Sequence, residues 1–448
     1  MSNNSKKKKK ARNEERPNPM NTLNMTSGSI ECASPCRQLV MAVQQSDGLV
    51  LEAVFLSLCL GMSDGSRVTG LPLSSANLME LESCMAMQSW MNRDVCTHNT
   101  TSLLFQSQIP LLQRAQALSP RPLSLLASAW SAPAWLKTNG ALTGKGSLKG
   151  QPGGKEHKTW AKYYVRFLEE YAKYNLSFWA MTTGNEPSAG QMTNYSFQAL
   201  GFTAEEQRDW VGLDLGPALH TSTHPHTHLL ILDDNRLLLP HWAKVVLSDV
   251  RAGRYIHGVG VHWYLDTLVP AELSLGTTHH LYPEYYLFGT EACAGWSPTD
   301  RGVRLGSWER AEQYAHSIIQ DLNHYVVGWT DWNLALDQGG GPNWVKNFVD
   351  SPIIVDHSRD IFYKQPTFYS MAHFSKFLWE GSQRVGVSFS QETILESSAF
   401  IRPDGSVVLT ILNRSSSEVQ FEVYDPAVGF ISSSAPAHAL LTLAWNTL

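Results

Sequence analysis

Two glutamates that each follow an apolar segment are the residues of this chain best placed for chemistry. Glu186 and its neighbour Asn185 come directly after the apolar run 178–183, and Glu291 comes directly after the run 285–290. Paired carboxyl groups can cleave a glycosidic bond, because one protonates the leaving oxygen while the other attacks the anomeric carbon or activates water. An asparagine beside the first glutamate could hydrogen-bond a sugar 2-hydroxyl. The pattern therefore predicts chemistry on a glycoside.

Aromatic and polar side chains follow the other apolar segments of the same region. They are Trp130, the pair Asp233 and Asp234, His262, Tyr264 and Trp332. In a barrel of parallel strands, the carboxyl ends of the strands share one rim, and catalytic side chains stand on that rim. The sequence therefore predicts that these residues gather around the two glutamates.

Apolar runs of strand length alternate with amphipathic stretches from about residue 108 onward. The strand candidates are residues 123–129, 178–183, 229–232, 258–264, 285–290 and 326–332. Each is apolar over most of its length, as in parallel strands covered on both faces, and aromatic residues spaced by three and four predict a helix over 157–174. This alternation favours an α/β fold, either a (β/α)8 TIM barrel or a doubly wound sheet. No glycine-rich phosphate loop follows these runs, which disfavours a dinucleotide-binding sheet.

The apolar period changes to two after about residue 384. Residues 399–401 and 407–412 flank Pro403-Asp404-Gly405, which is typical of a hairpin turn, and residues 419–424 and 440–445 continue the alternation. We therefore expect a barrel domain over residues 106–383 and a C-terminal all-β sandwich over residues 384–448.

The composition argues against two classes of function. Charged residues make up 17% of the chain and the net charge is -5, so a nucleic-acid-binding domain is not expected. No apolar run reaches the roughly 18 residues of a membrane-spanning helix. The 15 tryptophans fit a protein that binds flat apolar faces such as those of sugars, although core packing is the commoner use of a tryptophan.

The first 105 residues give a weaker signal. Residues 1–35 are polar and lysine-rich and predict a disordered basic tail, whereas residues 36–105 form a divergent segment with no clear alternation. The apolar stretch 49–62 resembles the hydrophobic region of a signal peptide that is displaced from the N-terminus, and a buried helix or strand is the alternative. Sequons at six positions give weak support to a secretory route: Asn3, Asn24, Asn99, Asn175, Asn194 and Asn413.

The cysteines and histidines do not predict a metal site. The six cysteines match no zinc or disulfide spacing, and their pairing is left open: Cys32, Cys36, Cys59, Cys84, Cys96 and Cys293. A histidine-rich tract includes His220, His224, His226 and His228. No carboxylate or cysteine stands at ligand spacing from this tract, so we expect a solvated loop there.

Several long segments resemble one known family. They are Trp135-Leu-Lys-Thr-Asn-Gly140, Gly144-Lys-Gly-Ser-Leu-Lys-Gly-Gln-Pro-Gly153, Asn185-Glu-Pro-Ser-Ala-Gly190, Val261-His-Trp-Tyr-Leu-Asp266, Gly328-Trp-Thr-Asp-Trp-Asn-Leu-Ala-Leu336 and Gly341-Pro-Asn-Trp-Val345. From about residue 108 to 448, the chain is similar to the acid β-glucosidases, or glucosylceramidases, of glycoside hydrolase family 30. The resemblance implies a (β/α)8 barrel with an attached β-sandwich.

The resemblance also implies roles for individual residues. It places the acid/base on Glu186 and the nucleophile on Glu291. It places substrate-binding positions on Trp130, Asn185, His262, Tyr264 and Trp332, with Asn347 at the entrance. The implied activity is the retaining hydrolysis of glucosylceramide to glucose and ceramide, in an acidic lysosome and at the surface of its lumenal membrane. An acidic phospholipid and a saposin activator are the implied partners, and the reaction needs no metal or other cofactor.

The chain departs from the family at two places. Gly184 stands where well-known mammalian members have glutamate, which changes the polarity near Glu186 but removes no catalytic carboxyl group. The family's Gly-Phe-Gly-Gly segment, and the Thr-Asp that follows it and binds glucose, have no counterpart in residues 1–105. Only six of the eight barrel strands are identifiable, so the barrel is expected to be incomplete at its N-terminal strands. A catalytically deficient or unstable member, another family 30 specificity such as xylosidase or glucanase, and a carbohydrate-binding protein are the alternatives.

Overall fold

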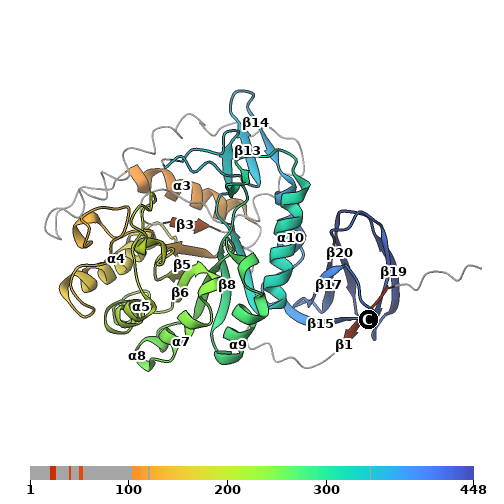
Figure 1. The fold of residues 1–448 in the computed structure, drawn as a ribbon, viewed down its shortest axis with the longest axis horizontal. Helices are drawn as coiled ribbons and strands as arrows, with labels where there is room; N and C mark the ends of the chain where they lie inside the picture. The colour runs from red at the N-terminus through yellow and green to blue at the C-terminus, as the bar shows by residue number, and fades with distance from the viewer. Residues whose placement is uncertain are drawn as a thin grey trace, which may run out of the picture.

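The computed structural model describes residues 21–26, 40–41, 50–53, 103–119, 122–343 and 345–447. A barrel-like sheet with surrounding helices forms one part, and an all-β module lies beside it (Figure 1). Helix α10 (Trp308–Asn323) packs between the two parts, because its apolar residues share a core with β11 and with two strands of the module. This architecture confirms the predicted α/β barrel with a C-terminal β-sandwich.

The barrel sheet has the strand order β2-β11-β8-β7-β6-β5-β4-β3. Its strands are β2 (Val40–Met41), β3 (Val50–Ala53), β4 (Leu125–Ser128), β5 (Phe178–Thr182), β6 (His228–Asn235), β7 (Gly258–His262), β8 (Tyr286–Glu291) and β11 (Val326–Asp331). All neighbouring pairs from β2 to β4 are parallel, whereas β3 runs antiparallel to β4. The six strands from β4 to β11 are the predicted ones, with ends that differ by a few residues.

Side chains fill the interior of the barrel. Residues from five strands form a buried cluster: Leu126, Ala180, Leu230, Tyr286, Phe288 and Val327. A barrel of this kind is a packed core and not a pore, so the open space for a ligand lies at the rim.

Helices cover the outside of the barrel. They are α3 (Leu103–Leu118), α4 (Lys155–Ala172), α5 (Ala204–Trp210), α6 (Gly216–His220), α7 (His241–Leu247), α8 (Val250–Gly253), α9 (Thr277–Leu281), α10 and α11 (Pro366–Ser375). Short turns of 3-10 or π type are η2 (Ala134–Leu136), η3 (Ala189–Gln191), η4 (Val211–Leu215), η5 (Arg236–Leu238), η6 (Asp266–Leu268) and η7 (Glu272–Gly276). Helix α4 is the predicted aromatic helix, and it buries Trp160, Tyr164 and Tyr171 against the sheet. Within the described ranges, no helix has the length and apolarity that crossing a membrane requires.

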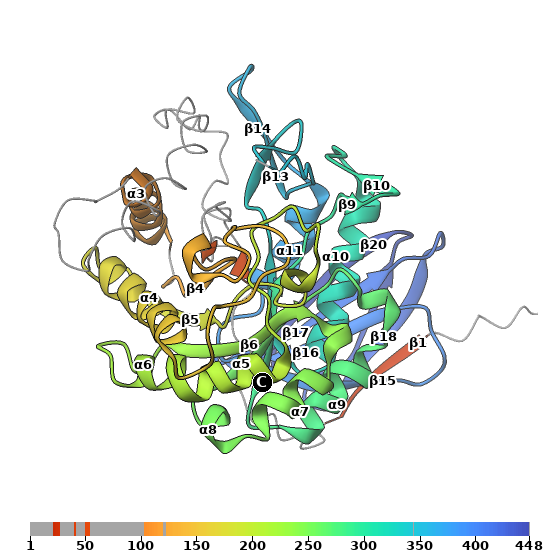
Figure 2. The same cartoon turned by 60° about the vertical axis from the view of Figure 1, so that its left-hand side comes forward.

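The all-β module has the strand order β19-β18-β1-β15-β16-β17-β20 (Figure 2). Its strands are β1 (Asn21–Thr26), β15 (Gln383–Phe389), β16 (Glu396–Ile401), β17 (Ser406–Asn413), β18 (Val419–Asp425), β19 (Gly429–Ala435) and β20 (Ala439–Asn446). Two smaller sheets pair β9 (Trp296–Ser297) with β10 (Asp300–Arg301), and β12 (Ala335–Asp337) and β14 (Ile361–Lys364) with β13 (Ile353–Asp356).

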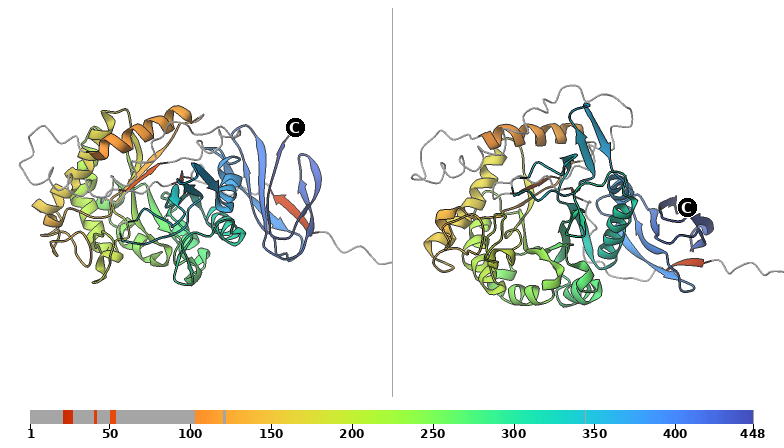
Figure 3. Two further views of the ribbon diagram at one scale, coloured as in Figure 1. Left: turned by 90° about the horizontal axis from the view of Figure 1, so that it is seen from above. Right: turned by 45° about the horizontal axis from the view of Figure 1, so that its top comes forward.

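Residues 21–26 form strand β1, although the sequence predicts a disordered tail over residues 1–35. It pairs in parallel with β18 and antiparallel with β15, far along the chain (Figure 3). Its backbone groups satisfy two strand edges that would otherwise face solvent. The divergent segment 36–105 likewise supplies β2 and β3 to the barrel sheet. Residues 50–53 of the stretch 49–62 form β3, and the rest of that stretch lies outside the described residues.

Candidate active site

Glu186 stands on a strained turn directly after β5. Its backbone φ is 41°, a value that non-glycine residues rarely adopt, and Gly184 before it has a φ of 129°. The turn is held from both sides, because the Asn185 N–H donates to the Ala129 carbonyl at 2.9 Å and the Glu186 N–H donates to the Asp233 carbonyl at 2.8 Å. Strain of this kind persists only where neighbouring structure enforces it, and it is common at functional sites.

The neighbour that enforces the turn is a bulge in β6. Leu232 and Asp233 both have positive φ, 68° and 54°, and the pairing of β6 with β7 shifts register between Leu232 and Asp234. A bulge re-aims side chains beside active sites. Here the Asp233 carboxylate accepts a hydrogen bond from the Ser128 hydroxyl at 2.5 Å and contacts His262 Nε2 at 3.0 Å. The sequence predicts Asp233 at the rim but indicates no role for it, because apolar periodicity cannot predict a bulge.

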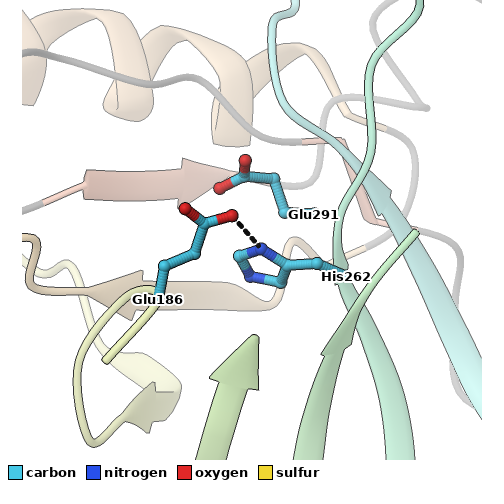
Figure 4. Close-up of side chains that lie close together, drawn as sticks. All are labelled: Glu186, His262 and Glu291. Atoms are coloured by element: carbon cyan, nitrogen blue, oxygen red, sulfur yellow. Dashed lines mark hydrogen bonds and ion pairs between the residues drawn. The ribbon is translucent and has the colours of Figure 1, made fainter. Parts of the chain in front are cut away.

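His262 joins Glu186 to Asp233. Its Nδ1 lies 3.2 Å from Glu186 Oε1 (Figure 4). Its Nε2 lies 3.0 Å from Asp233 Oδ1 on the other side. Burial alone lowers the pKa of His262, but the charge of Glu291 and the hydrogen bonds to Asp233 and Glu186 outweigh it, and the pKa lies well above its usual range. Both ring nitrogens then donate to carboxylates, so His262 can orient Glu186. The contact of His262 with substrate stays a prediction.

Glu291 lies opposite Glu186, at the end of β8. The two glutamates and His262 each offer one atom within 4.8 Å of the others, and the two carboxyl groups face one another (Figure 4). The Tyr264 hydroxyl donates to Glu291 Oε1 at 2.6 Å, whereas Glu291 Oε2 is buried without a partner among the described residues. The structure therefore leaves one oxygen of Glu291 available to a ligand.

The close approach of the carboxyl groups affects their protonation. Burial raises the pKa of Glu291 to about 8, and the charge of Glu186 acts in the same direction, while His262 and the Tyr264 hydroxyl oppose them. A neighbouring negative charge disfavours ionisation of a carboxyl group. Glu291 is therefore harder to ionise beside Glu186 than it would be alone.

An aromatic wall stands beside the carboxyl groups. The rings of Trp130 and Trp332 are stacked with their centroids 6.0 Å apart, and Phe197 packs against Trp130 at 5.6 Å. Trp130 and Trp332 are buried, and the indole N–H of each has no partner among the described residues. Unpaired buried donors beside flat rings fit a polar ligand with an apolar face.

Tyr195 is a site residue that the sequence reasoning missed. Its hydroxyl donates to Glu186 Oε2 at 2.9 Å, so both oxygens of Glu186 are held. Tyr195 lies in an irregular loop after β5, together with Phe197, and no strand or motif marks either residue. Their signal is in the tertiary structure alone.

Two predicted substrate-binding residues, Asn185 and Asn347, have fewer contacts that would fix a role. The Asn185 side chain is buried beside Glu186. Asn347 lies in the loop between β12 and β13, and its Oδ1 accepts a long hydrogen bond from Arg301 at 3.4 Å. Among the described residues, no hydrogen bond joins Asn347 to the carboxyl groups.

Glu186, His262 and Glu291 are also the described residues whose spacing could hold a cation. Both nitrogens of His262 are already engaged by carboxylates. Acid–base chemistry therefore explains this cluster more completely than metal ligation.

A barrel with two facing carboxyl groups on its rim and an appended β-sandwich defines a class of glycoside hydrolases. The chain belongs to glycosyl hydrolase family 30, because residues 87–378 match the TIM-barrel domain of that family and residues 381–443 match its β-sandwich domain. The barrel match begins earlier in the chain than the resemblance at residue 108. The predicted class, a glycoside hydrolase, is thereby confirmed.

Several relatives are similar to the chain over most of its length. It is 58% identical to the lysosomal acid glucosylceramidase of Mus musculus, over 76% of this chain and 66% of that protein. It is 43% identical to putative glucosylceramidase 4 of Caenorhabditis elegans, over 72% of this chain and 62% of that protein. The chain therefore spans somewhat less than two thirds of the length of these relatives.

Solved structures share the fold at low identity. SrfJ from Salmonella typhimurium superposes with a TM-score of 0.73 at 23% identity, over 97% of this chain and 94% of that chain. An endo-β1,6-glucanase superposes with a TM-score of 0.70 at 19% identity, over 95% of this chain and 94% of that chain.

Proposed function

We propose that this chain is a retaining β-glucosidase that hydrolyses glucosylceramide, with Glu186 as acid/base and Glu291 as nucleophile. The observation that carries the proposal is the approach of the two carboxyl groups, which have atoms within 4.8 Å of each other. Retaining glycosidases hold these groups about 5–5.5 Å apart, whereas inverting enzymes need roughly 6.5–9.5 Å to admit a water between them.

The first step forms a covalent glucosyl-enzyme. Glu291 Oε2, the oxygen without a partner, attacks the anomeric carbon while the bond from that carbon to the ceramide oxygen breaks. Glu186 gives its proton to the departing oxygen. Tyr264 stabilises the ionised Glu291 by donating to Oε1.

The second step reverses these roles. Glu186, now ionised, takes a proton from water, and the water oxygen attacks the anomeric carbon as its bond to Glu291 breaks. Glucose leaves with the configuration of the substrate, and both carboxyl groups return to their starting states. His262 and Tyr195 keep the Glu186 carboxyl group in place through both steps, because each holds one of its oxygens.

The 58% identity to the mouse lysosomal acid glucosylceramidase supports glucosylceramide as the substrate and the lysosome as the location. We further propose that the chain works at the surface of a lumenal membrane, with an acidic phospholipid and a saposin activator. In the barrel, the sequons at Asn175 and Asn194 lie on exposed residues, as a secretory route requires, whereas Asn413 of the sandwich is fully buried. We expect a bell-shaped pH profile centred on the acid side of neutrality.

One experiment tests the reaction and its specificity together. The full chain is incubated with an aryl β-glucoside and with the matching β-xyloside, with and without vesicles of acidic phospholipid, and the anomer released first is read by proton NMR. We expect β-glucose, a strong preference for the glucoside and stimulation by the vesicles. Release of α-glucose would contradict retention. Preference for the xyloside would indicate another family 30 substrate specificity. No turnover of either substrate would favour a catalytically deficient family member or a carbohydrate-binding protein.

A further inference from the structure

A buried ammonium group lies behind the rim of the barrel. Lys137 follows the short turn η2, in the loop after β4, and is 0% exposed. Its Nζ donates to the carbonyl oxygens of Ala199 at 2.6 Å and Leu142 at 2.7 Å, and to the Ser131 hydroxyl at 3.2 Å. Among the described residues, no carboxylate forms an ion pair with it. Burying a charge without a counter-ion is costly, so a chain keeps such a group only where its hydrogen bonds matter.

The acceptors of Lys137 join two loops that are remote in sequence. Leu142 belongs to the loop after β4, and Ala199 belongs to the loop after β5. The Ser131 hydroxyl contacts the same two carbonyl oxygens at 3.2 and 3.3 Å, and the Ala199 N–H donates to Leu142 O at 3.1 Å. Lys137 is therefore the centre of a polar cluster, in which Leu142 O and Ala199 O are each shared by several donors.

The loop that Lys137 holds is the one that reaches the acid/base. The Tyr195 carbonyl accepts from the Gly144 N–H at 2.9 Å, so this loop is fastened to the loop after β4 a second time. Tyr195 donates to Glu186 Oε2, and Phe197, two residues before Ala199, packs against Trp130. A displacement of Ala199 would be transmitted to both residues, because they lie on the same short stretch of chain.

We propose that Lys137 is a positioning residue for acid catalysis, whose buried ammonium group fixes the loop after β5 so that Tyr195 holds Glu186 towards the leaving oxygen. This inference rests on the proposed glucosidase activity. Burial lowers the pKa of Lys137 to about 8, so the ammonium form persists throughout the acid and neutral range in which the enzyme is expected to work.

The leaving group of the substrate distinguishes positioning from a general loss of structure. A dinitrophenyl β-glucoside needs little protonation of its leaving oxygen, whereas an alkyl β-glucoside depends on the acid. Lys137→Met should lower kcat/KM for the alkyl glucoside at least about 10-fold more than for the dinitrophenyl glucoside, since a general acid contributes on the order of 10²–10⁴. Tyr195→Phe should show the same bias, and the double variant should lose little more than the larger single loss.

Lys149 provides a matched control in the same region. Its Nζ also donates to a backbone carbonyl, that of Trp135 at 2.8 Å, but its side chain is exposed. Lys149→Met should leave the rates on both substrates unchanged. Equal losses on both substrates with Lys137→Met, or additive losses with Tyr195→Phe, would overturn the proposal.

A second variant covers the case in which Lys137→Met does not fold. Ser131→Ala removes only one hydroxyl from the cluster and should give a smaller loss with the same bias towards the alkyl glucoside. An unbiased effect of Ser131→Ala, or none, would then overturn the proposal. A wild-type chain that turns over neither glucoside would instead contradict the proposed function itself.

Discussion

The carboxylate rim and the two end strands of the barrel sheet are built in different ways. The rim is formed by strands β4 to β8 and β11, which follow one another along the chain. These strands run parallel, so the residues after each of them lie at the same edge of the sheet. The end strands β2 and β3 come from the N-terminal segment, and β3 is antiparallel to its neighbour. The rim therefore carries the chemistry that the family requires, while the ends of the sheet depend on residues that resemble the family least.

The direction of β3 has a consequence for the site. Val50 pairs with Ser128, which is the rim end of β4, and Ala53 pairs with Leu125 at the opposite end. Strand β3 therefore ends at the edge of the sheet away from the carboxyl groups, whereas a parallel strand would end at the rim.

The largest expected effect comes from removing the nucleophile and leaving the sheet intact. Glu291→Gln should reduce cleavage of every β-glucoside by on the order of 10⁴-fold or more, because no covalent intermediate can form. The measurement is kcat for alkyl and dinitrophenyl glucosides, with the thermal midpoint as a check on folding. Residual turnover within about 10-fold of the wild type would contradict the assignment of Glu291.

A smaller and selective effect should follow from removing the acid. Glu186→Gln should lower kcat/KM for an alkyl glucoside by about 10²–10⁴-fold, because its leaving oxygen needs a proton. A dinitrophenyl glucoside should retain glycosylation at a rate close to the wild type. Equal losses on both substrates would contradict the division of roles between Glu186 and Glu291.

The same variant should alter the pH dependence. The charge of Glu186 raises the pKa of Glu291, so replacing it with a neutral amide should lower that pKa and move the acidic limb of the profile to lower pH. The alkaline limb should disappear for the dinitrophenyl glucoside, because its leaving oxygen does not need the acid. Limbs that stay as in the wild type would contradict this prediction.

A third experiment acts on the end strands and leaves the rim unchanged. Residues 1–105 are replaced by the corresponding N-terminal segment of the mouse lysosomal acid glucosylceramidase. We expect the chimera to turn over an aryl glucoside roughly 30- to 1000-fold faster than the native chain, the gain that one buried charged hydrogen bond to the sugar provides. The chimera should also have a higher thermal midpoint than the native chain. Comparable turnover by the native chain would show that residues 36–105 already complete the site.

The sequence predicted the molecule best where a run of apolar residues marks a strand and a glutamate follows that run. Apolar runs of strand length placed β4 to β8 and β11, and the carboxyl groups after two of them, Glu186 and Glu291, lie face to face in the structure. Periodicity is a local signal, so it could not place β1 between β15 and β18, which are remote in sequence. The positive φ angles of Leu232 and Asp233 have no sequence signature either, since neither residue is glycine.

The smallest expected effect concerns stability and pH. Burial raises the pKa of Asp266 to about 8 and that of Asp321 to about 6. Between the ordinary carboxyl range near pH 4 and these raised values, the folded chain binds more protons than the unfolded chain. The free energy of unfolding therefore falls as pH rises through this window. The raised pKa of His262 acts in the same direction.

We therefore expect the thermal midpoint to be a few degrees higher at pH 5 than at pH 8, the shift that about 1–2 kcal/mol produces in a domain of this size. Asp266→Asn removes one of the two carboxyl groups that contact the Arg236 guanidinium, and it should reduce this difference. Asp249→Asn is the matched control, because hydrogen bonds from Arg251 lower the pKa of Asp249 to about 2 and it is ionised in both states throughout the window. Differential scanning calorimetry of the three proteins at both pH values measures the effect. A midpoint that rises from pH 5 to pH 8 would contradict the claim that buried protonated carboxyl groups suit this chain to an acidic compartment.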